Sequence, residues 1–353
     1  TVDKFSDFIS EQKNEQPYKL IIFNHSAEMV RDVKDTSLSE LIKLLNDTAK
    51  KTQVKIYNVD FVGLFLSKKN GKRFINSFPF NQEGEVILPN QKDNLVKQYQ
   101  PPIEINPENT ILLPRGMGTV DFTSSRTWID TVTSLELEGF VTIPSVKTWD
   151  ICTSKYLTDI MCRNNGLRTP KTVAISYSED TDRAVKELNS KFPLILKTST
   201  GSQTGVGVTV VESLRSLHSS VQMLKLYKKY LPLLIQEYIK TDFDVRVIVL
   251  DNEVLGAMRR DVIDGDVRSN ASLGAKTESL ELTDLEIQDS IKAAQTVEGK
   301  LVGVDFIPSK NREKERPYIL EVNSMPGFGG IEKIQKGLTE KIFNNFKNRE
   351  NWR

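Results

Sequence analysis

The chain is poor in the residues that build thiolate and imidazole sites. Its 353 residues include two cysteines and two histidines. His25 and His218 lie in no serine or cysteine nucleophile context, so hydrolase-type nucleophilic catalysis is not expected. Cys152 and Cys162 are ten residues apart in a stretch that reads as a single helix, where they could not form a disulfide. A reducing cytoplasm is the simplest interpretation.

One-sided charge and long apolar runs are also missing. The net charge of +1 gives no general attraction to nucleic acid or to acidic membranes, so neither is expected as a partner. No run of about eighteen apolar residues indicates a membrane span, and no charged-then-apolar leader indicates a secretory signal. The composition, 38% hydrophobic and 27% charged, is ordinary for a globular protein, and the length allows two or three domains.

The most informative segment is a predicted hairpin late in the chain. The runs VGVDFI and YILEVN alternate like strands, and the polar segment SKNREKER between them predicts the turn. If the hairpin folds about Glu313, Asp305 lies opposite Glu321, and Asn323 shares their face. Oxygen ligands without histidine or cysteine favour magnesium or manganese over zinc, with nucleotide phosphates as further ligands. The alternative is a solvent-facing strand pair with ordinary surface acids.

The first part of the chain reads as an α/β domain. KLIIFN, the helical stretch SLSELIKLLNDTAKK and QVKIYNVD predict a parallel βαβ start, and TILLPRG resumes the sheet. Residues near 67–109 are polar and proline-rich, so we expect an insert outside that sheet. A boundary near residue 148 defines an N-terminal domain over 1–148.

Two α+β lobes are predicted to follow. Residues 149–231 alternate strands and helices around a glycine-rich turn, and residues 232–353 are richer in strands. Within the second lobe, DVRVIV and VLGAMRR predict a hairpin about Asp251, and Thr283 with Glu286 has the spacing of a capping box. The amphipathic tail GIEKIQKGLTEKIFNNFK predicts a final helix.

A phosphate-binding flap is predicted after the apolar strand PLILK. Lys197 closes that strand, and Gly201 and Gly205 in TSTGSQTGVGV let backbone amides approach an anion. The segment is not a Walker A loop, because no Gly-Lys-Ser/Thr ends it. Lys155 is a candidate for a second phosphate cation. The alternatives are a plain hairpin with a flexible turn and an exposed helix lysine.

Base, ribose and phosphate contacts are predicted further along. The run LPLLIQEYIK turns polar after a buried strand, which suits a linker over Gln236, Glu237, Tyr238 and Ile239 whose backbone reads an adenine edge, with Asp244 on a sugar hydroxyl. Fixed guanidinium groups suit carboxylate and phosphoryl oxygens. The candidates are Arg246, Arg259, Arg260 and the segment Arg268, Ser269 and Asn270. The alternatives are surface strand positions and solvated surface charges.

Five blocks follow one another between about Lys155 and Ile334: PLILKTSTGSQTGVGV, LIQEYIKTDFDVRVIV, AMRRDVIDGDVRSNASLGA, VGVDFI and LEVNSMPGFGGIEK. In their order and spacing they resemble the ATP-grasp superfamily, and most closely its RimK-type amino-acid ligases. The resemblance implies an ATP-grasp fold with a Rossmann-like preceding domain, a central small lobe and a C-terminal lobe. It implies ATP between the lobes and two magnesium ions on Asp305, Glu321 and Asn323.

The resemblance also implies a carboxylate–amine ligase that works through an acyl-phosphate, with glutamate added to the C-terminus of a peptide or protein. The long polar insert departs from the family pattern, so the family's ribosomal-protein substrate is not carried over. The alternatives are a ligase for a small molecule or a carrier protein, and an ATP-binding regulator without turnover. A dimer or tetramer is implied by resemblance alone. Substitution of Asp305 or Glu321 is expected to abolish turnover with much less effect on folding.

Overall fold

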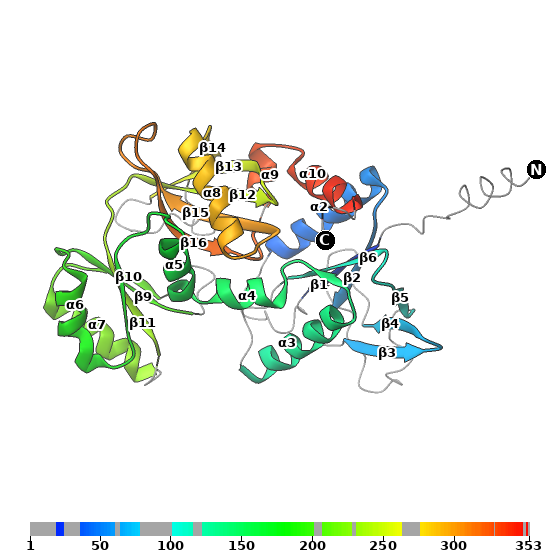
Figure 1. Ribbon diagram of the computed structural model, residues 1–353, viewed down its shortest axis with the longest axis horizontal. Coiled ribbons are helices and arrows are strands. Elements are labelled where there is room, and N and C mark those ends of the chain that lie inside the picture. The colour runs from blue at the N-terminus through cyan, green and yellow to red at the C-terminus, as the bar shows by residue number, and fades with distance from the viewer. Residues whose placement is uncertain are drawn as a thin grey trace, which may run out of the picture. The chain divides into compact units, whose positions relative to one another are not determined.

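The computed structural model describes residues 19–24, 36–60, 64–77, 101–115, 122–200, 207–227, 231–262, 276–327, 329–348 and 351 (Figure 1). The chain forms two compact units. The first comprises Thr1–Leu113, Leu135–Val141 and Phe343–Arg353, and the second comprises Pro114–Ser134 and Thr142–Ile342. The predicted three-part division at residues 148 and 231 is a finer one and stays a prediction.

The N-terminal sheet begins with the predicted parallel βαβ unit. Strands β1 (Lys19–Asn24) and β2 (Lys55–Asp60) pair in parallel, and α2 (Thr36–Thr52) connects them. Strands β6 (Thr110–Pro114) and β7 (Val141–Thr142) complete the order β2-β1-β6-β7, and α3 (Phe122–Leu137) joins these two strands. The middle residues of β1 and β6 are fully buried, which explains why both strands read as continuous apolar runs.

Part of the predicted insert is a small sheet of its own. Strands β3 (Phe65–Lys69), β4 (Lys72–Asn76) and β5 (Ile103–Ile105) form an antiparallel three-stranded sheet. These residues therefore lie outside the main sheet, as predicted, and they form strands of their own. The tight turn at Asn70 and Gly71, both at positive φ, joins β3 and β4. Residues 78–100 lie outside the described residues.

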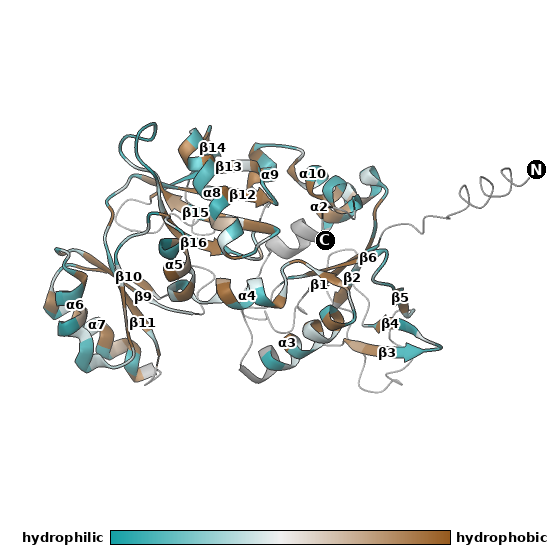
Figure 2. Cartoon of the chain, in the orientation of Figure 1, coloured by the Kyte–Doolittle hydropathy of each residue, from teal (hydrophilic) through white to brown (hydrophobic). Residues whose placement is uncertain are grey.

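The second unit contains two antiparallel sheets. The first has the order β10-β9-β11-β8, from β8 (Thr172–Ile175), β9 (Leu194–Thr198), β10 (Val208–Val211) and β11 (Leu233–Glu237). Following β8, η3 (Ser178–Asp180) and α6 (Thr181–Leu188) lie on one face together with α7 (Leu214–Tyr227). In Figure 2 the strands of this sheet are mainly brown, whereas α6 and α7 carry teal residues on their outer sides.

The second sheet has the order β14-β13-β12-β15-β16. Its strands are β12 (Phe243–Leu250), β13 (Glu253–Asp261), β14 (Thr277–Ser279), β15 (Leu301–Ile307) and β16 (Tyr318–Asn323). The predicted hairpin between β12 and β13 is confirmed, with Asp251 at a φ of +53° in its turn. Helix α8 (Asp284–Thr296) starts with the predicted capping box, in which Thr283 and Glu286 each accept from the other's backbone N–H.

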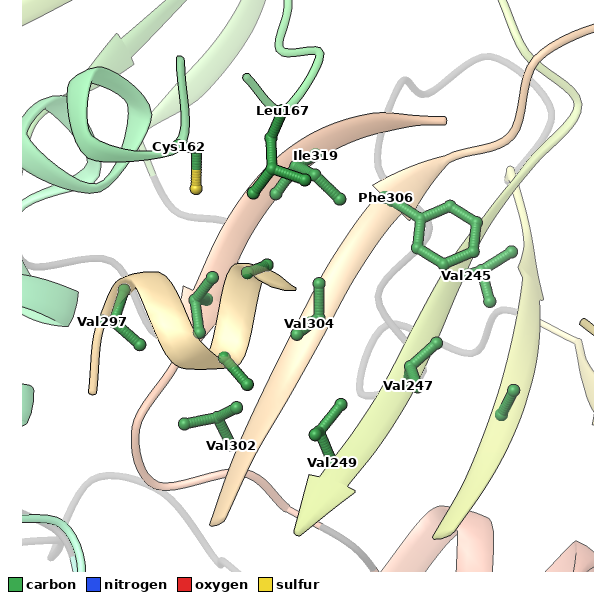
Figure 3. Close-up of a cluster of buried hydrophobic side chains, with 14 of the residues drawn as sticks. Cys162, Leu167, Val245, Val247, Val249, Val297, Val302, Val304, Phe306 and Ile319 are labelled. Atoms are coloured by element: carbon green, nitrogen blue, oxygen red, sulfur yellow. The ribbon is translucent and has the colours of Figure 1, made fainter. Parts of the chain in front are cut away.

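One face of this sheet is the apolar core that packs against α8. Figure 3 shows Val245, Val247 and Val249 of β12 beside Val304 and Phe306 of β15, all directed to the same side. Because successive side chains of a strand point to opposite faces, the residues between them point to the other face. That second face carries the candidate site.

Two helices predicted to be continuous are broken. Ser154 separates α4 (Val146–Thr153) from α5 (Lys155–Asn164), and its side chain accepts from the Leu157 N–H as an N-cap. The tail forms α9 (Gly329–Ile334) and α10 (Leu338–Lys347), with Gly337 between them at a φ of +95°. Periodicity does not reveal such short breaks, because apolar spacing continues across them.

The break at Ser154 changes the prediction for the cysteines. Cys152 and Cys162 lie on different helices, so the argument from a single helix was wrong. Both thiols are nevertheless free. Burial raises the pKa of each thiol to about 12, so both are neutral and unreactive near neutral pH.

Candidate functional site

The predicted oxygen ligands come together on neighbouring strands. Asp305 of β15 pairs directly with Glu321 of β16, so the predicted register is confirmed. Asn323 lies two residues further along β16, and its amide donates to Glu321 Oε1 over 3.2 Å. Asp305 is buried, whereas Glu321 and Asn323 are partly exposed. The three side chains thus offer oxygen atoms at one end of the hairpin.

Asp305 is held between two arginines that the sequence had singled out. Arg246 lies opposite it on β12 and donates from Nε to Oδ1 over 2.8 Å and from Nη2 to Oδ2 over 2.6 Å. Arg260 donates to the same Oδ2 over 3.1 Å. The bidentate contact of Arg246 follows from the planar guanidinium, which matches a carboxylate in geometry as well as charge.

The arginines fix the ionisation of this group. Burial alone would raise the pKa of Asp305, but the charges and hydrogen bonds of Arg246 and Arg260 hold the pKa well below its usual range. Burial likewise opposes the charge on Arg260, and its carboxylate partners raise its pKa above the ordinary value. Asp305 is therefore a permanent anion near neutral pH, as a metal or guanidinium partner requires.

Asp244 belongs to the same network. It lies opposite Arg260 in the β12–β13 ladder, and its two oxygens accept from Arg260 Nε and Nη2 over 2.7 and 2.8 Å. Asp244 is buried. Its predicted role on a ribose hydroxyl stays a prediction, and in this structure its carboxylate serves as a counterion to Arg260.

Arg259 is not brought to this group. As the neighbour of Arg260 on β13 it points to the opposite face of the sheet. There its guanidinium lies 3.9 Å from the centre of the Phe243 ring and donates to Asp261 over 2.7 Å. The geometry thus joins Arg246 and Arg260 to the candidate site and leaves the predicted catalytic role of Arg259 without a structural argument.

Lys197 is buried at the end of β9. Its ammonium donates to Gln236 Oε1 over 3.0 Å, and Gln236 in turn donates to Thr172 Oγ1 over 2.7 Å. The pKa of Lys197 is lowered to about 8, mainly by burial; the charge of Glu321 opposes this shift and the charge of Lys155 adds to it. Lys155 and Glu321 are thus close enough to Lys197 to affect the charge of its ammonium group.

Lys155 begins α5, which connects the two sheets of this unit. The Lys155 N–H donates to the Ser199 carbonyl just beyond β9, over 2.9 Å. The same helix contacts β16 and β8. This contact fixes the start of α5 beside the strand that carries Lys197.

The predicted adenine linker follows β11. Glu237 ends the strand, its N–H donates to the Lys171 carbonyl over 2.9 Å, and its carboxylate accepts from the Lys171 N–H over 3.3 Å. Tyr238 and Ile239 lie between β11 and β12 without regular structure. Their contacts to a base stay predictions. The predicted phosphate-binding residues Gly201, Gly205, Arg268, Ser269 and Asn270 lie outside the described residues.

Sequence reasoning missed Arg115. This buried arginine donates to the Pro326 carbonyl over 2.7 Å, in the loop that directly follows Asn323. Burial lowers the pKa of Arg115 to about 10, which still leaves it protonated near neutral pH. The same loop packs over β15, because a Cβ on Gly303 would lie 2.9 Å from Pro326 Cβ. The one sequence signal for Arg115 is the segment LLPRG, in which an arginine directly follows a buried strand.

The residues present fit a magnesium ion. No group of three or more histidine, cysteine, aspartate or glutamate side chains that could hold a metal occurs among the described residues. The available donors are instead the carboxylates of Asp305 and Glu321 and the amide oxygen of Asn323. An incomplete, all-oxygen set is typical of magnesium sites, where phosphates and water supply the remaining ligands.

A comparison with known families matches residues 153–345 to the RimK-like ATP-grasp domain, which covers more than half of the chain. The chain belongs to this family. A coenzyme gamma-F420-2:alpha-L-glutamate ligase of Methanocaldococcus jannaschii is 31% identical over 219 residues, which cover 60% of this chain and 71% of that protein. A probable alpha-L-glutamate ligase of Coxiella burnetii is 35% identical over 48% of this chain and 55% of its own length. The chain thus spans little more than half of the latter.

Solved structures support the fold over nearly the whole chain. The ATP-grasp ligase PsnB in complex with a minimal precursor has a TM-score of 0.61 at 16% identity, covering 95% of this chain and 99% of PsnB. D-alanine–D-alanine ligase of Bacillus anthracis has a TM-score of 0.56 at 16% identity, covering 94% and 93%. The predicted ATP-grasp fold is confirmed, and the protein is an ATP-grasp ligase.

Proposed function

We propose that this ligase joins the amino group of glutamate, or of a similar amino acid, to the terminal carboxylate of a peptide or protein. The observation that carries the proposal is the row Glu321, Asp305 and Arg246 across three strands, with Arg260 beside it. Such a row offers fixed charges of both signs to a transferring phosphoryl group, and the glutamate preference comes from the names of the relatives.

The chemistry needs two steps. A carboxylate oxygen of the acceptor attacks the γ-phosphorus of ATP, the bond to the bridging oxygen breaks, and ADP leaves. The free amine of the donor then attacks the acyl carbon, phosphate departs with the bonding electrons, and the nitrogen loses a proton as the amide forms. No side-chain nucleophile takes part, which agrees with the scarcity of cysteine and histidine.

The residues contribute by position and charge. Lys197 and Lys155 would bind ATP phosphates, and Arg246 and Arg260 would face the oxygens of the acyl-phosphate. Two magnesium ions on Asp305, Glu321 and Asn323 would neutralise charge between the transferring oxygens. The protein side chains thus supply electrostatic stabilisation rather than covalent chemistry.

A small-molecule acceptor is the second candidate. It is favoured by the relative that is named for coenzyme gamma-F420-2 and that matches 60% of this chain. Peptide acceptors are favoured by neighbours of the same fold whose structures were solved with precursor or leader peptides. A ligase for a carrier protein uses the same chemistry and differs in the acceptor alone.

The test is phosphate release from ATP with magnesium, glutamate and a panel of acceptors, followed by mass spectrometry of the acceptors. The expected result is phosphate release that requires glutamate and a peptide carboxylate, with the acceptor gaining the mass of a glutamyl residue. Release with small carboxylic acids and with no peptide would favour the second candidate. ATP binding without release under any combination would contradict the ligase assignment of this site.

A cytoplasmic location, a dimer or tetramer, and the absence of a nucleic-acid partner stay predictions. Within the described part of the chain, none of the helices has the length and apolar character needed to cross a membrane.

A further inference from the structure

The central sheet of the second unit has an open edge. Strand β8 ends the order β10-β9-β11-β8, so one of its two sides pairs with no strand among the described residues. An open edge presents unpaired N–H and C=O groups and can template pairing with another chain. It therefore matters which residues of β8 direct these groups outward.

The hydrogen bonds of β11 decide this. The Glu237 N–H donates to the Lys171 carbonyl, which makes Glu237 and Lys171 a hydrogen-bonded pair of the β11–β8 ladder. On the other side of β11, the Ser199 N–H donates to the Pro232 carbonyl. The even-numbered residues of β11 therefore bond to β9, and the odd-numbered residues bond to β8. Hydrogen-bonded and non-hydrogen-bonded pairs alternate along an antiparallel ladder, so Val173, two residues from Lys171, directs its main-chain groups toward β11.

Thr172 and Ala174 consequently direct their main-chain groups outward. In the part of the chain that the structure describes, no residue bonds the N–H or C=O of these two residues. Alternate residues of a strand bond to the same neighbouring strand, so the N–H and C=O groups of Thr172 and Ala174 are placed to form hydrogen bonds with an added strand.

A groove runs along this edge. A pocket of about 380 Å³ is lined by all four residues of β8, and consecutive residues line one pocket when the strand presents its edge to it. Helix α5 forms one wall through Tyr156 and Arg163, which lie two turns apart on one helix face. The other wall is formed by Asp180 at the end of η3 and by Arg183, Ala184 and Glu187 of α6.

We propose that an extended peptide segment of the acceptor docks in this groove by adding a strand to β8. The main-chain groups of Thr172 and Ala174 would pair with the peptide backbone, and its side chains would alternate between the two walls. Arg163 of the α5 wall already donates from Nη2 to Asp159 of the same helix over 2.9 Å. Its side chain is 43% exposed and lines the groove, and a guanidinium has further N–H donors, so acidic side chains fit on that side. That the segment belongs to the acceptor rests on the proposed function; strand addition itself does not.

Side-chain hydrogen bonds link the strand at this edge to the proposed nucleotide lysine. Thr172 Oγ1 accepts from Gln236, whose amide oxygen accepts from Lys197. Thr172, with which the peptide would pair, therefore lies two hydrogen bonds from Lys197, across the one intervening strand β11. A docking segment at this place would hold the acceptor close to the proposed site of chemistry and raise its local concentration there.

The direct test is a binding measurement with the full chain. The probe is a fluorescent, capped peptide of about twelve residues, long enough for a strand, that alternates threonine and glutamate. Its control is the same peptide with every second amide N-methylated, which removes one pairing edge. We expect the probe to bind and the N-methylated peptide to bind at least about tenfold more weakly. Equal binding of the two peptides, or no binding of the probe, would overturn the proposal.

Two variants locate the probe. Ala174→Pro removes one outward N–H and leaves the ladder to β11 intact, a position where an edge strand tolerates proline; Ala174→Ser keeps the N–H and is its match. Ala174→Pro should weaken binding about tenfold, and Ala174→Ser by less than about twofold. Should Ala174→Pro fail to fold, Arg163→Gln replaces it, with weaker binding of the glutamate probe and unchanged binding of a glutamine analogue as the expected result. Unchanged binding of the glutamate probe would sink the proposal.

Turnover separates docking from chemistry. With a long peptide acceptor, Ala174→Pro should raise KM and leave kcat unchanged, and with a short acceptor that has the same terminal residues both constants should stay the same. Equal KM values for the long acceptor would refute docking of the acceptor at β8. Absence of phosphate release with every acceptor would refute the proposed function, and the binding data would still decide strand addition. Self-association that Ala174→Pro abolishes would assign the edge to a second copy of this chain instead.

Discussion

Asp305→Asn removes one charge from the centre of the arginine network and keeps the size of the side chain. Asp305 Oδ1 accepts from Arg246, and Oδ2 accepts from Arg246 and Arg260. An asparagine retains one oxygen, and its amide would direct donors at a guanidinium that itself only donates. The substitution therefore loses hydrogen bonds as well as charge.

The expected cost follows from burial. Removing one partner of a buried ion pair costs about 3–5 kcal/mol. Arg260 keeps two bonds to Asp244, and the Arg246 side chain is 22% exposed, so the lower end of that range applies. A loss of about 3 kcal/mol lowers the melting temperature of a unit of this size by roughly 6–12 °C. The sequence alone predicted that substitution of Asp305 would affect folding much less than turnover; the buried ion pairs add this expected loss of stability to the expected loss of turnover.

The pH dependence has a definite sign. The pKa of Asp305 in the folded protein is below its ordinary value, so its contribution to stability is complete above the unfolded pKa of about 3.9 and is lost as the pH falls through the folded pKa. The stability difference between wild type and Asp305→Asn should stay constant from neutral pH down to about pH 4. It should narrow only in stronger acid.

Thermal melting without nucleotide measures the effect, and Glu321→Gln is the matched control. Glu321 is half-buried, and the one hydrogen bond shown for it comes from Asn323, so its substitution should change the melting temperature little. Both variants should lose turnover if both carboxylates hold the proposed cation. A melting temperature for Asp305→Asn within about two degrees of the wild type would refute the reasoning from the buried pair.

Three further outcomes are expected. Lys197 has a pKa of about 8 because it is buried, so ATP affinity measured by calorimetry should fall as the pH rises through about 8 in the wild type and not in Lys197→Arg; a flat wild-type profile would contradict this. Arg260→Lys loses the two-pronged contact with Asp244, so turnover should fall about tenfold or more while ADP affinity changes less; equal losses would assign Arg260 to nucleotide binding. Magnesium alone should bind weakly, because Asp305 is already matched by Arg246 and Arg260, and ADP should raise its affinity by supplying phosphate oxygens; similar affinities with and without ADP would argue against a shared site.

Strand alternation made part of the site predictable from sequence. The pairing of Asp305 with Glu321 followed from two alternating runs and the centre of a charged turn, and the structure has that register. The βαβ start and the capping box at Thr283 were equally local and were equally well predicted. Interactions that depend on tertiary packing left no such pattern. The contact of Arg115 with Pro326 joins residues 211 positions apart, and the chain from Lys197 through Gln236 to Thr172 joins three strands.

Neighbouring residues of the same type show the limit most clearly. Arg259 and Arg260 looked equivalent in the sequence, yet one stacks on Phe243 and the other is buried between Asp244 and Asp305. Alternation states that two adjacent residues face opposite sides, and it does not state which side carries the function. The apolar residues supply that information. Val245, Val247 and Val249 pack into the core on one face of the sheet, so the residues between them lie on the polar face. Reading the valines of β12 first, and tracing their face through the hairpin register to β13, would have separated the two arginines without a structure.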